Sequence, residues 1–217
     1  KYNTRMPNPY SYVSLTQVLN DHYKVMKSLP AIMNGALVLS PSEVETVHLT
    51  INSVMQCPFC TGLHCELGRM SGLDSYSLNS SLTLESALAN TPHPSIALYS
   101  HNFATRGRHD PKDYRDLASS IGSSRASAVS GLSWFLRWGA FGGNTILSLS
   151  SSPAPLAAAV GLYYAPLYAV IKAVSKCMEA MPTGGPEVVG RAVGLTLPVV
   201  AGVWIVPLGV LGGLGKV

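Results

Sequence analysis

Two cysteines and a histidine lie close together in the run Cys57-Pro-Phe-Cys60-Thr-Gly-Leu-His64. Proline fits the first turn of a helix, where its missing N–H is not needed, so Pro58 predicts that a helix begins beside Cys57. Cys60 and His64 are four residues apart and therefore share one face of that helix. The run thus requires a helix with two thiols at its N-terminal end, and the neighbouring elements have to pack around it.

The segment before the cysteines carries the start signals of another helix. Ser40 fits the N-cap position, Pro41 the first helical position and Glu43 the capping-box position. Apolar residues then recur at helical spacing, so this helix leads the chain to Cys57. Glu45 lies on it, twelve residues before Cys57, and it can reach the thiols only if the two helices pack against each other.

Helical spacing and capping signals predict that the rest of the first 150 residues is helical as well. Residues 12–39 are expected to form one helix or two, because Pro30 interrupts the apolar pattern. Ser123 or Ser124 is expected to cap the last helix of this part. The further helices are predicted at 84–90, 95–106, 113–119 and 123–146. We therefore expect an all-α domain over residues 1–150.

Residues 151–217 differ in character. No charged side chain occurs between Trp138 and residue 172 or over 192–215, and each stretch approaches or reaches the ~20 apolar residues that cross a bilayer core. Residues 172–191 carry charges and are expected to form a loop. Small residues recur at four-residue spacing, which lets membrane helices approach closely. We predict a hydrophobic hairpin of two transmembrane helices that anchors the domain in lipid; the alternative is two buried helices of a soluble assembly.

The composition agrees with a chain that is held in a membrane or a membrane complex. Charged residues make up 12% of the chain and hydrophobic residues 47%, whereas charged residues make up about 25% of an ordinary soluble domain. The net charge of +4 is modest. Lysines and arginines are scattered and no aromatic residues alternate with them, so nucleic acid is not expected as a partner.

Three of the four cysteines lie within nine residues, which indicates a local redox or metal site rather than a disulfide framework. Zinc would have four nominal ligands: Cys57, Cys60, His64 and Cys65. A zinc knuckle, however, takes its second ligand pair from another element a dozen or more residues away. We therefore expect no metal here, and we expect Cys65, which points about 100° away from His64 on the helix, to be a small core residue.

A redox site is favoured by the positions of the two thiols. The thiolate is the reactive form of cysteine, and its pKa falls near a helix N-terminus, where Cys57 lies, or near a cationic histidine, as at Cys60. His64 can accept the Cys60 proton, and Glu45 can orient His64 or relay protons. His48, one turn after Glu45, either joins this relay or is a satisfied core histidine. These five are the candidate catalytic residues; the alternative is two buried cysteines that happen to lie three residues apart.

The run Ser40-Pro41-Ser42-Glu43-Val44-Glu45, then eleven residues, then Cys57, Cys60 and His64 resembles a family pattern. It is similar to the peroxidase-related branch of the carboxymuconolactone decarboxylase and alkylhydroperoxidase D superfamily. The resemblance extends weakly to the flanks, where Phe141-Gly-Gly-Asn144 stands at the place of an aromatic-Asn segment in that family. Two features depart from the pattern: Met55-Gln56 stands where the family often has Asn-Gly, and the hydrophobic tail has no counterpart.

This resemblance implies an all-helical fold and a thiol-dependent peroxidase. Cys60 would attack the peroxide and Cys57 would resolve the product, with His64 as the base and Glu45 as the proton relay. The partners would be a hydroperoxide or disulfide substrate and a thiol electron donor. The family needs no metal or organic cofactor, and its members assemble as trimers or hexamers.

Two hypotheses for function follow from the motif and the tail. The first is a membrane-tethered thiol-disulfide oxidoreductase that reduces hydroperoxides through the cysteine pair. The alternative is an accessory, non-catalytic subunit of a large organellar membrane complex, photosynthetic or respiratory, that recruited this fold. Both place the chain in an organellar membrane, the thylakoid or the mitochondrial inner membrane. A third and weaker hypothesis is a soluble enzyme whose tail closes its own core.

Overall fold

The computed structural model describes residues 8–73, 91–149, 152 and 154–179. This part of the chain is helical and contains no β-strand, so the prediction of an all-α protein is confirmed. The predicted loop and helix at 74–90 lie outside the described residues, as does the second predicted membrane segment at 192–215. The helices are α1 (Leu15–Val38), α2 (Pro41–Met55), α3 (Pro58–Met70), α6 (Pro94–Arg106), α7 (Pro111–Ile121), α8 (Ser123–Leu147) and α9 (Ala154–Glu179).

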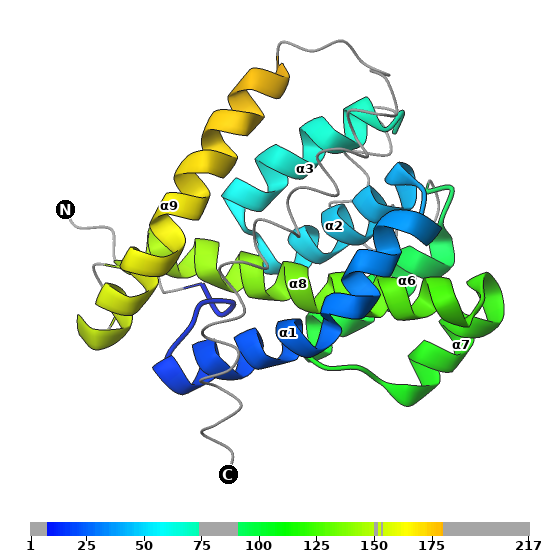
Figure 1. The fold of residues 1–217 in the computed structure, drawn as a ribbon, viewed down its shortest axis with the longest axis horizontal. Coiled ribbons are helices and arrows are strands. Elements are labelled where there is room, and N and C mark those ends of the chain that lie inside the picture. Colours follow the sequence, from blue (N-terminus) through cyan, green and yellow to red (C-terminus); the bar gives the residue numbers. More distant parts are fainter. Residues whose placement is uncertain (1–7, 74–90, 150–151, 153, 180–217) are drawn as a thin grey trace.

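Helix α8 is the centre of the fold, and Figure 1 shows it running through the middle of the molecule between α1 and α2. It packs against every other described helix. Small residues on its surface allow this: a Cβ at Gly131 would lie 3.0 Å from the Cβ of Ala31 and 3.1 Å from the backbone nitrogen of Ile32. The absence of a side chain at Gly131 therefore sets how closely α1 can cross α8.

Helix α1 is a single helix that contains Pro30, and Figure 1 shows it bending along its length. Proline removes one backbone hydrogen bond and its ring crowds the preceding turn, which is the usual cause of such a bend. The prediction left one helix or two open. The chain keeps one because apolar residues on both sides of the bend, Val25 and Ile32, are almost fully buried in the same core.

Most predicted helix starts are confirmed. At α2 the Ser40 hydroxyl accepts the Glu43 N–H at 3.3 Å, and the Glu43 carboxylate accepts the Ser40 N–H at 2.8 Å. The buried Glu43 carboxylate also pairs with Arg125 on α8, which fastens the start of α2 to the central helix. The cap predicted for α8 is wrong: neither serine caps it, and the N-cap is Gly122, with a φ of 88°.

Helix α9 differs from the first arm of the predicted hairpin, because it continues into the expected loop at 172–191 as far as Glu179. Four side chains at four-residue spacing are buried on the face that meets α3 and α8: Leu156, Val160, Tyr164 and Tyr168. Lys172 and Lys176 belong to the same helix and are exposed. No helix among the described residues is both long and apolar enough to span a bilayer.

One buried histidine joins α1, α8 and α9. The Nδ1 atom of His22 lies 2.7 Å from the carbonyl oxygen of Val18, and its Nε2 atom accepts the indole N–H of Trp138 at 3.0 Å. These two contacts identify the neutral ring with its proton on Nδ1. From α9, Tyr163 and Tyr164 pack on this ring with centroids at 5.0 and 5.9 Å.

Candidate dithiol site

A sharp corner between α2 and α3 places the first thiol. Gln56 adopts a left-handed conformation, with φ 54° and ψ 44°, and its N–H donates to the Asn52 carbonyl at 2.7 Å. This conformation ends α2 and lets α3 begin within two residues. Cys57 is then the N-cap of α3, with Pro58 in its first turn, as the sequence predicted.

Asn144 on α8 holds this corner from the other side. Its Nδ2 group donates to the carbonyl oxygens of Met55, at 2.9 Å, and of Tyr10, at 3.3 Å. The Met55 carbonyl belongs to the last turn of α2 and would otherwise lack a helical partner. Sequence reasoning noted Asn144 only through the family resemblance; its role here is to position the backbone just before the cysteines.

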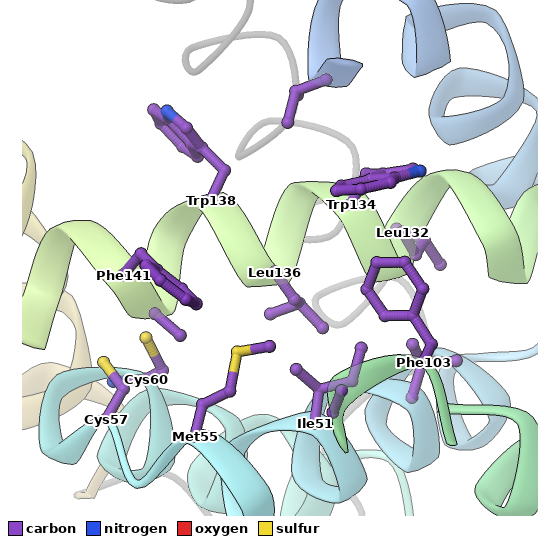
Figure 2. Close-up of a cluster of buried hydrophobic side chains, with 14 of the residues drawn as sticks. Ile51, Met55, Cys57, Cys60, Phe103, Leu132, Trp134, Leu136, Trp138 and Phe141 are labelled. Carbon is purple, nitrogen blue, oxygen red and sulfur yellow. The ribbon is translucent and has the colours of Figure 1, made fainter. Parts of the chain in front are cut away.

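The two cysteines form a buried pair of free thiols. Cys57 is fully buried and Cys60 is 6% exposed. The backbone N–H of Cys60 donates to the Cys57 sulfur at 3.4 Å. Figure 2 shows both sulfurs at one end of the apolar layer between α2 and α8, next to Met55 and Phe141. The pair therefore lies between helices rather than on an open surface.

The two thiols have pKa values that are shifted in opposite directions. A hydrogen bond from the Cys60 thiol lowers the pKa of Cys57; burial opposes this, and the N–H groups at the start of α3 reinforce it. The same contact with the Cys57 sulfur, together with burial, raises the pKa of Cys60 well above its usual range. A thiolate is stabilised at a helix N-terminus because backbone N–H groups point at it. Cys57 is thus the sulfur that carries negative charge first.

Glu45, His48 and His64 form a second buried group, contributed by α2 and α3. The Nδ1 atom of His64 donates to Oε2 of Glu45 at 2.9 Å, and Nδ1 of His48 lies 3.4 Å from Oε1. The two imidazole rings are 3.8 Å apart at their centroids. The packing of α2 against α3 therefore brings Glu45 to His64. The sequence required this packing if Glu45 was to reach the site.

Electrostatics fix the charge state of this group. Burial alone would raise the pKa of Glu45, but the two facing imidazoles outweigh it and lower that pKa to about 2. Burial lowers the pKa of His48 to about 4, with His64 adding to the effect and Glu45 opposing it. At neutral pH Glu45 is therefore a carboxylate and His48 a neutral imidazole.

Two of the predicted relationships differ in the structure. Cys60 and His64 share one face of α3, but no hydrogen bond joins them, and Nδ1 of His64 donates to Glu45. His48 is not the satisfied core histidine that was the alternative, because neither of its ring nitrogens has a hydrogen-bond partner among the described residues. Cys65 is partly buried beside Glu66, and burial raises its pKa.

Sequence reasoning missed that side chains of α9 pack over the two cysteines. The Tyr168 ring packs on Phe59 with centroids 5.0 Å apart, and its hydroxyl donates to the carbonyl oxygen of Gly139. Burial and the two sulfurs raise the pKa of Tyr168 well above its usual range. A Cβ at Gly143 would lie 2.8 Å from the Cys57 sulfur and 3.2 Å from this ring. Four-residue spacing of aromatics in an uncharged stretch was the available signal.

The described part of the chain is thus an all-α protein with a buried dithiol next to a carboxylate–imidazole group. Comparisons with protein-family models, with curated proteins and with solved structures found no match to this chain. The chemistry of the site is therefore what points to a function.

Proposed function

We propose that this chain is an alkylhydroperoxidase D-like thiol-disulfide oxidoreductase that reduces hydroperoxides through Cys57 and Cys60. The observation that carries the proposal is the juxtaposition of two free thiols at a helix N-terminus with the Glu45–His64 pair on the adjoining turns. Neither element alone is informative, because isolated dithiols and buried ion pairs are common. Together they supply a stabilised thiolate and a base that is oriented by a carboxylate.

The reaction balances with the two cysteines, a hydroperoxide and an external thiol as the reductant. A thiolate sulfur attacks one oxygen of R–O–O–H, the O–O bond breaks, and the sulfur becomes a sulfenic acid while the leaving alkoxide takes up a proton. The second thiol attacks the sulfenic sulfur, which forms the Cys57–Cys60 disulfide and releases water. Two equivalents of an external thiol then restore the dithiol. His64, oriented by Glu45, accepts the thiol proton and returns it to the alkoxide.

The order of attack follows from the pKa difference. The lowered pKa of Cys57 and the raised pKa of Cys60 favour Cys57 as the attacking sulfur. The family resemblance implies the reverse order, with Cys60 attacking and Cys57 resolving. Because either order ends in the same disulfide, overall turnover does not separate them, whereas trapping the sulfenic acid does.

The test uses the full chain in the presence of a chelator, with cumene hydroperoxide as substrate and dithiothreitol as reductant. Conversion of the hydroperoxide to its alcohol should fall to background in C57S and in C60S, and Glu45→Gln should slow it by roughly 100-fold. Cys65→Ser is the matched control and should keep full turnover. Equal turnover in the wild type and in the C57S/C60S double variant would sink the proposal.

A sulfenic-acid trap followed by mass spectrometry then assigns the attacking sulfur. After one equivalent of peroxide, a trapped product in C60S that is absent from C57S supports attack by Cys57. The opposite pattern supports the order that the resemblance implies.

The burial of Cys57 beneath α9 favours a second candidate, an accessory subunit of an organellar membrane complex in which the dithiol is not turned over. Cys57 is fully buried, and Gly143 and Tyr168 close the space next to its sulfur. Gentle solubilisation of membranes from the source cells followed by affinity purification tests this candidate. Co-purification of a large complex together with inactive thiols supports it, and a free, active protein refutes it.

A further inference from the structure

The Glu45, His48 and His64 cluster has a geometry that the thiol chemistry does not require. Glu45 and His48 lie three residues apart on one face of α2, and His64 faces them from α3. One ligand atom from each residue lies within 4.8 Å of those of the other two. The carboxylate is placed between the two rings, since Oε2 faces His64 at 2.9 Å and Oε1 faces His48 at 3.4 Å.

His48 is the residue that this chemistry leaves unexplained. Its side chain is 9% exposed, yet neither ring nitrogen makes a hydrogen bond to any described residue. Its Nδ1 atom lies 3.4 Å from Oε1 of Glu45, which is longer than the 2.9 Å contact that His64 makes with Oε2. A buried polar group without a partner is unfavourable, because it has given up its hydrogen bonds to water. A ligand that accepts the lone pair of His48 removes part of this cost.

We propose that Glu45, His48 and His64 bind a divalent first-row transition metal ion of the Zn²⁺ type. Three protein ligands with one position open is the arrangement of zinc sites that also bind water or substrate. Two imidazoles and a carboxylate suit Zn²⁺ and its neighbours, whereas Mg²⁺ and Ca²⁺ prefer oxygen ligands throughout.

The distances fit this assignment. Nitrogen and oxygen ligands lie about 2.0–2.2 Å from Zn²⁺, which places two ligand atoms at a tetrahedral angle about 3.4 Å apart. The Glu45–His48 separation of 3.4 Å matches this spacing, whereas the 2.9 Å contact of Glu45 with Nδ1 of His64 is a hydrogen bond whose proton an ion would replace. The ligands also come from two packed helices, so an ion would tie α2 to α3.

The metal site does not rest on the proposed peroxidase function, because neither sulfur belongs to it. The two share Glu45 and His64, however, and an ion there would occupy the lone pairs that proton transfer uses. Bound metal and peroxide turnover are therefore measured separately, and the failure of one leaves the other standing.

The experiment starts from the full chain stripped with a chelator, loaded with Zn²⁺ and separated from free ion by gel filtration. We expect one bound zinc per chain in the wild type, the same in the C57S/C60S double variant, and none in His48→Asn. Loading with Mg²⁺ should leave no bound ion. Zinc uptake that survives in His48→Asn, that is lost with the cysteines, or that is absent from the wild type would each overturn the assignment.

A second measurement on the wild type covers the case in which His48→Asn fails to fold. X-ray absorption at the zinc edge should give a shell of nitrogen and oxygen ligands at about 2.0–2.1 Å and no sulfur at about 2.3 Å. Co²⁺ in place of zinc should give a visible spectrum without thiolate charge-transfer bands. A sulfur shell in the wild type would assign the ion to the cysteines and refute the proposal.

Discussion

His22 makes the stability of the fold depend on pH in a calculable way. Burial lowers its pKa to about 4, against an ordinary value of 6.5, although the contact with the Val18 carbonyl opposes the shift. Protonating Nε2 would remove the acceptor of the Trp138 N–H. Tyr163 and Tyr164, which face the ring from α9, both have pKa values raised by burial and stay neutral throughout.

The sign follows from proton uptake. Between pH 6.5 and about 4 the unfolded chain binds a proton at His22 and the folded chain does not, so the free energy of unfolding falls as the pH falls through this window. The contribution of neutral His22 to the free energy of unfolding is fully present above the pKa that His22 has in the unfolded chain. Going from about pH 7 to about pH 4.5 should remove roughly 2 kcal/mol through this one residue.

Urea unfolding followed by circular dichroism measures this loss in the wild type and in His22→Gln. Glutamine can still accept from Trp138 and donate to the Val18 carbonyl, but it does not titrate. The variant should lose about 2 kcal/mol less than the wild type over the same pH range. All other titrating groups are common to both proteins and cancel in the comparison. Parallel pH profiles would refute the reasoning.

Two further substitutions test the corner that holds the thiols. Gly143→Ala introduces a Cβ 2.8 Å from the Cys57 sulfur and should destabilise the protein by about 1–3 kcal/mol in urea unfolding. The matched control Gly62→Ala on α3 has open space around it and should be neutral or stabilising by up to about 1 kcal/mol. Similar changes in stability for both variants would contradict the close packing at Gly143. Asn144→Ala removes one of two side-chain donors to the Met55 carbonyl and leaves Asn8, at 3.3 Å, as the other, so it should cost about 0.5–1.5 kcal/mol. Unchanged stability in that variant would show that the bond is not needed.

The helices next to the thiols could be predicted because their signals are local. Ser40 and Glu43 close a capping box within one turn, and Pro58 fits the first turn of a helix, so neighbouring residues decide the backbone there. The predicted N-cap of α8 was wrong because the local signal was misleading there. Its serines look like caps, but the turn is made by Gly122 in a conformation that only the structure reveals.

The packing of α9 and part of the site could not be predicted, because they depend on contacts between distant segments. An uncharged stretch has the same sequence pattern whether it faces lipid or packs on protein. What decides for α9 is the bare backbone at Gly142 and Gly143, which leaves room for the rings of Tyr164 and Tyr168. Likewise, helical spacing predicted that His48 shares a helix face with Glu45. It could not predict that the two ring nitrogens of His48 lack hydrogen-bond partners among the described residues.

The position of Cys57 beneath α9 makes that thiol an internal gauge of local unfolding. A reagent too large for the closed packing can modify a fully buried sulfur only during the moments when α9 lifts from α3 and α8. When reclosing is faster than modification, the observed rate is the intrinsic rate multiplied by the opening constant. The rate of Cys57 modification therefore reports, without an introduced cysteine, the free energy of opening α9, which can be compared with the free energy of unfolding the whole bundle.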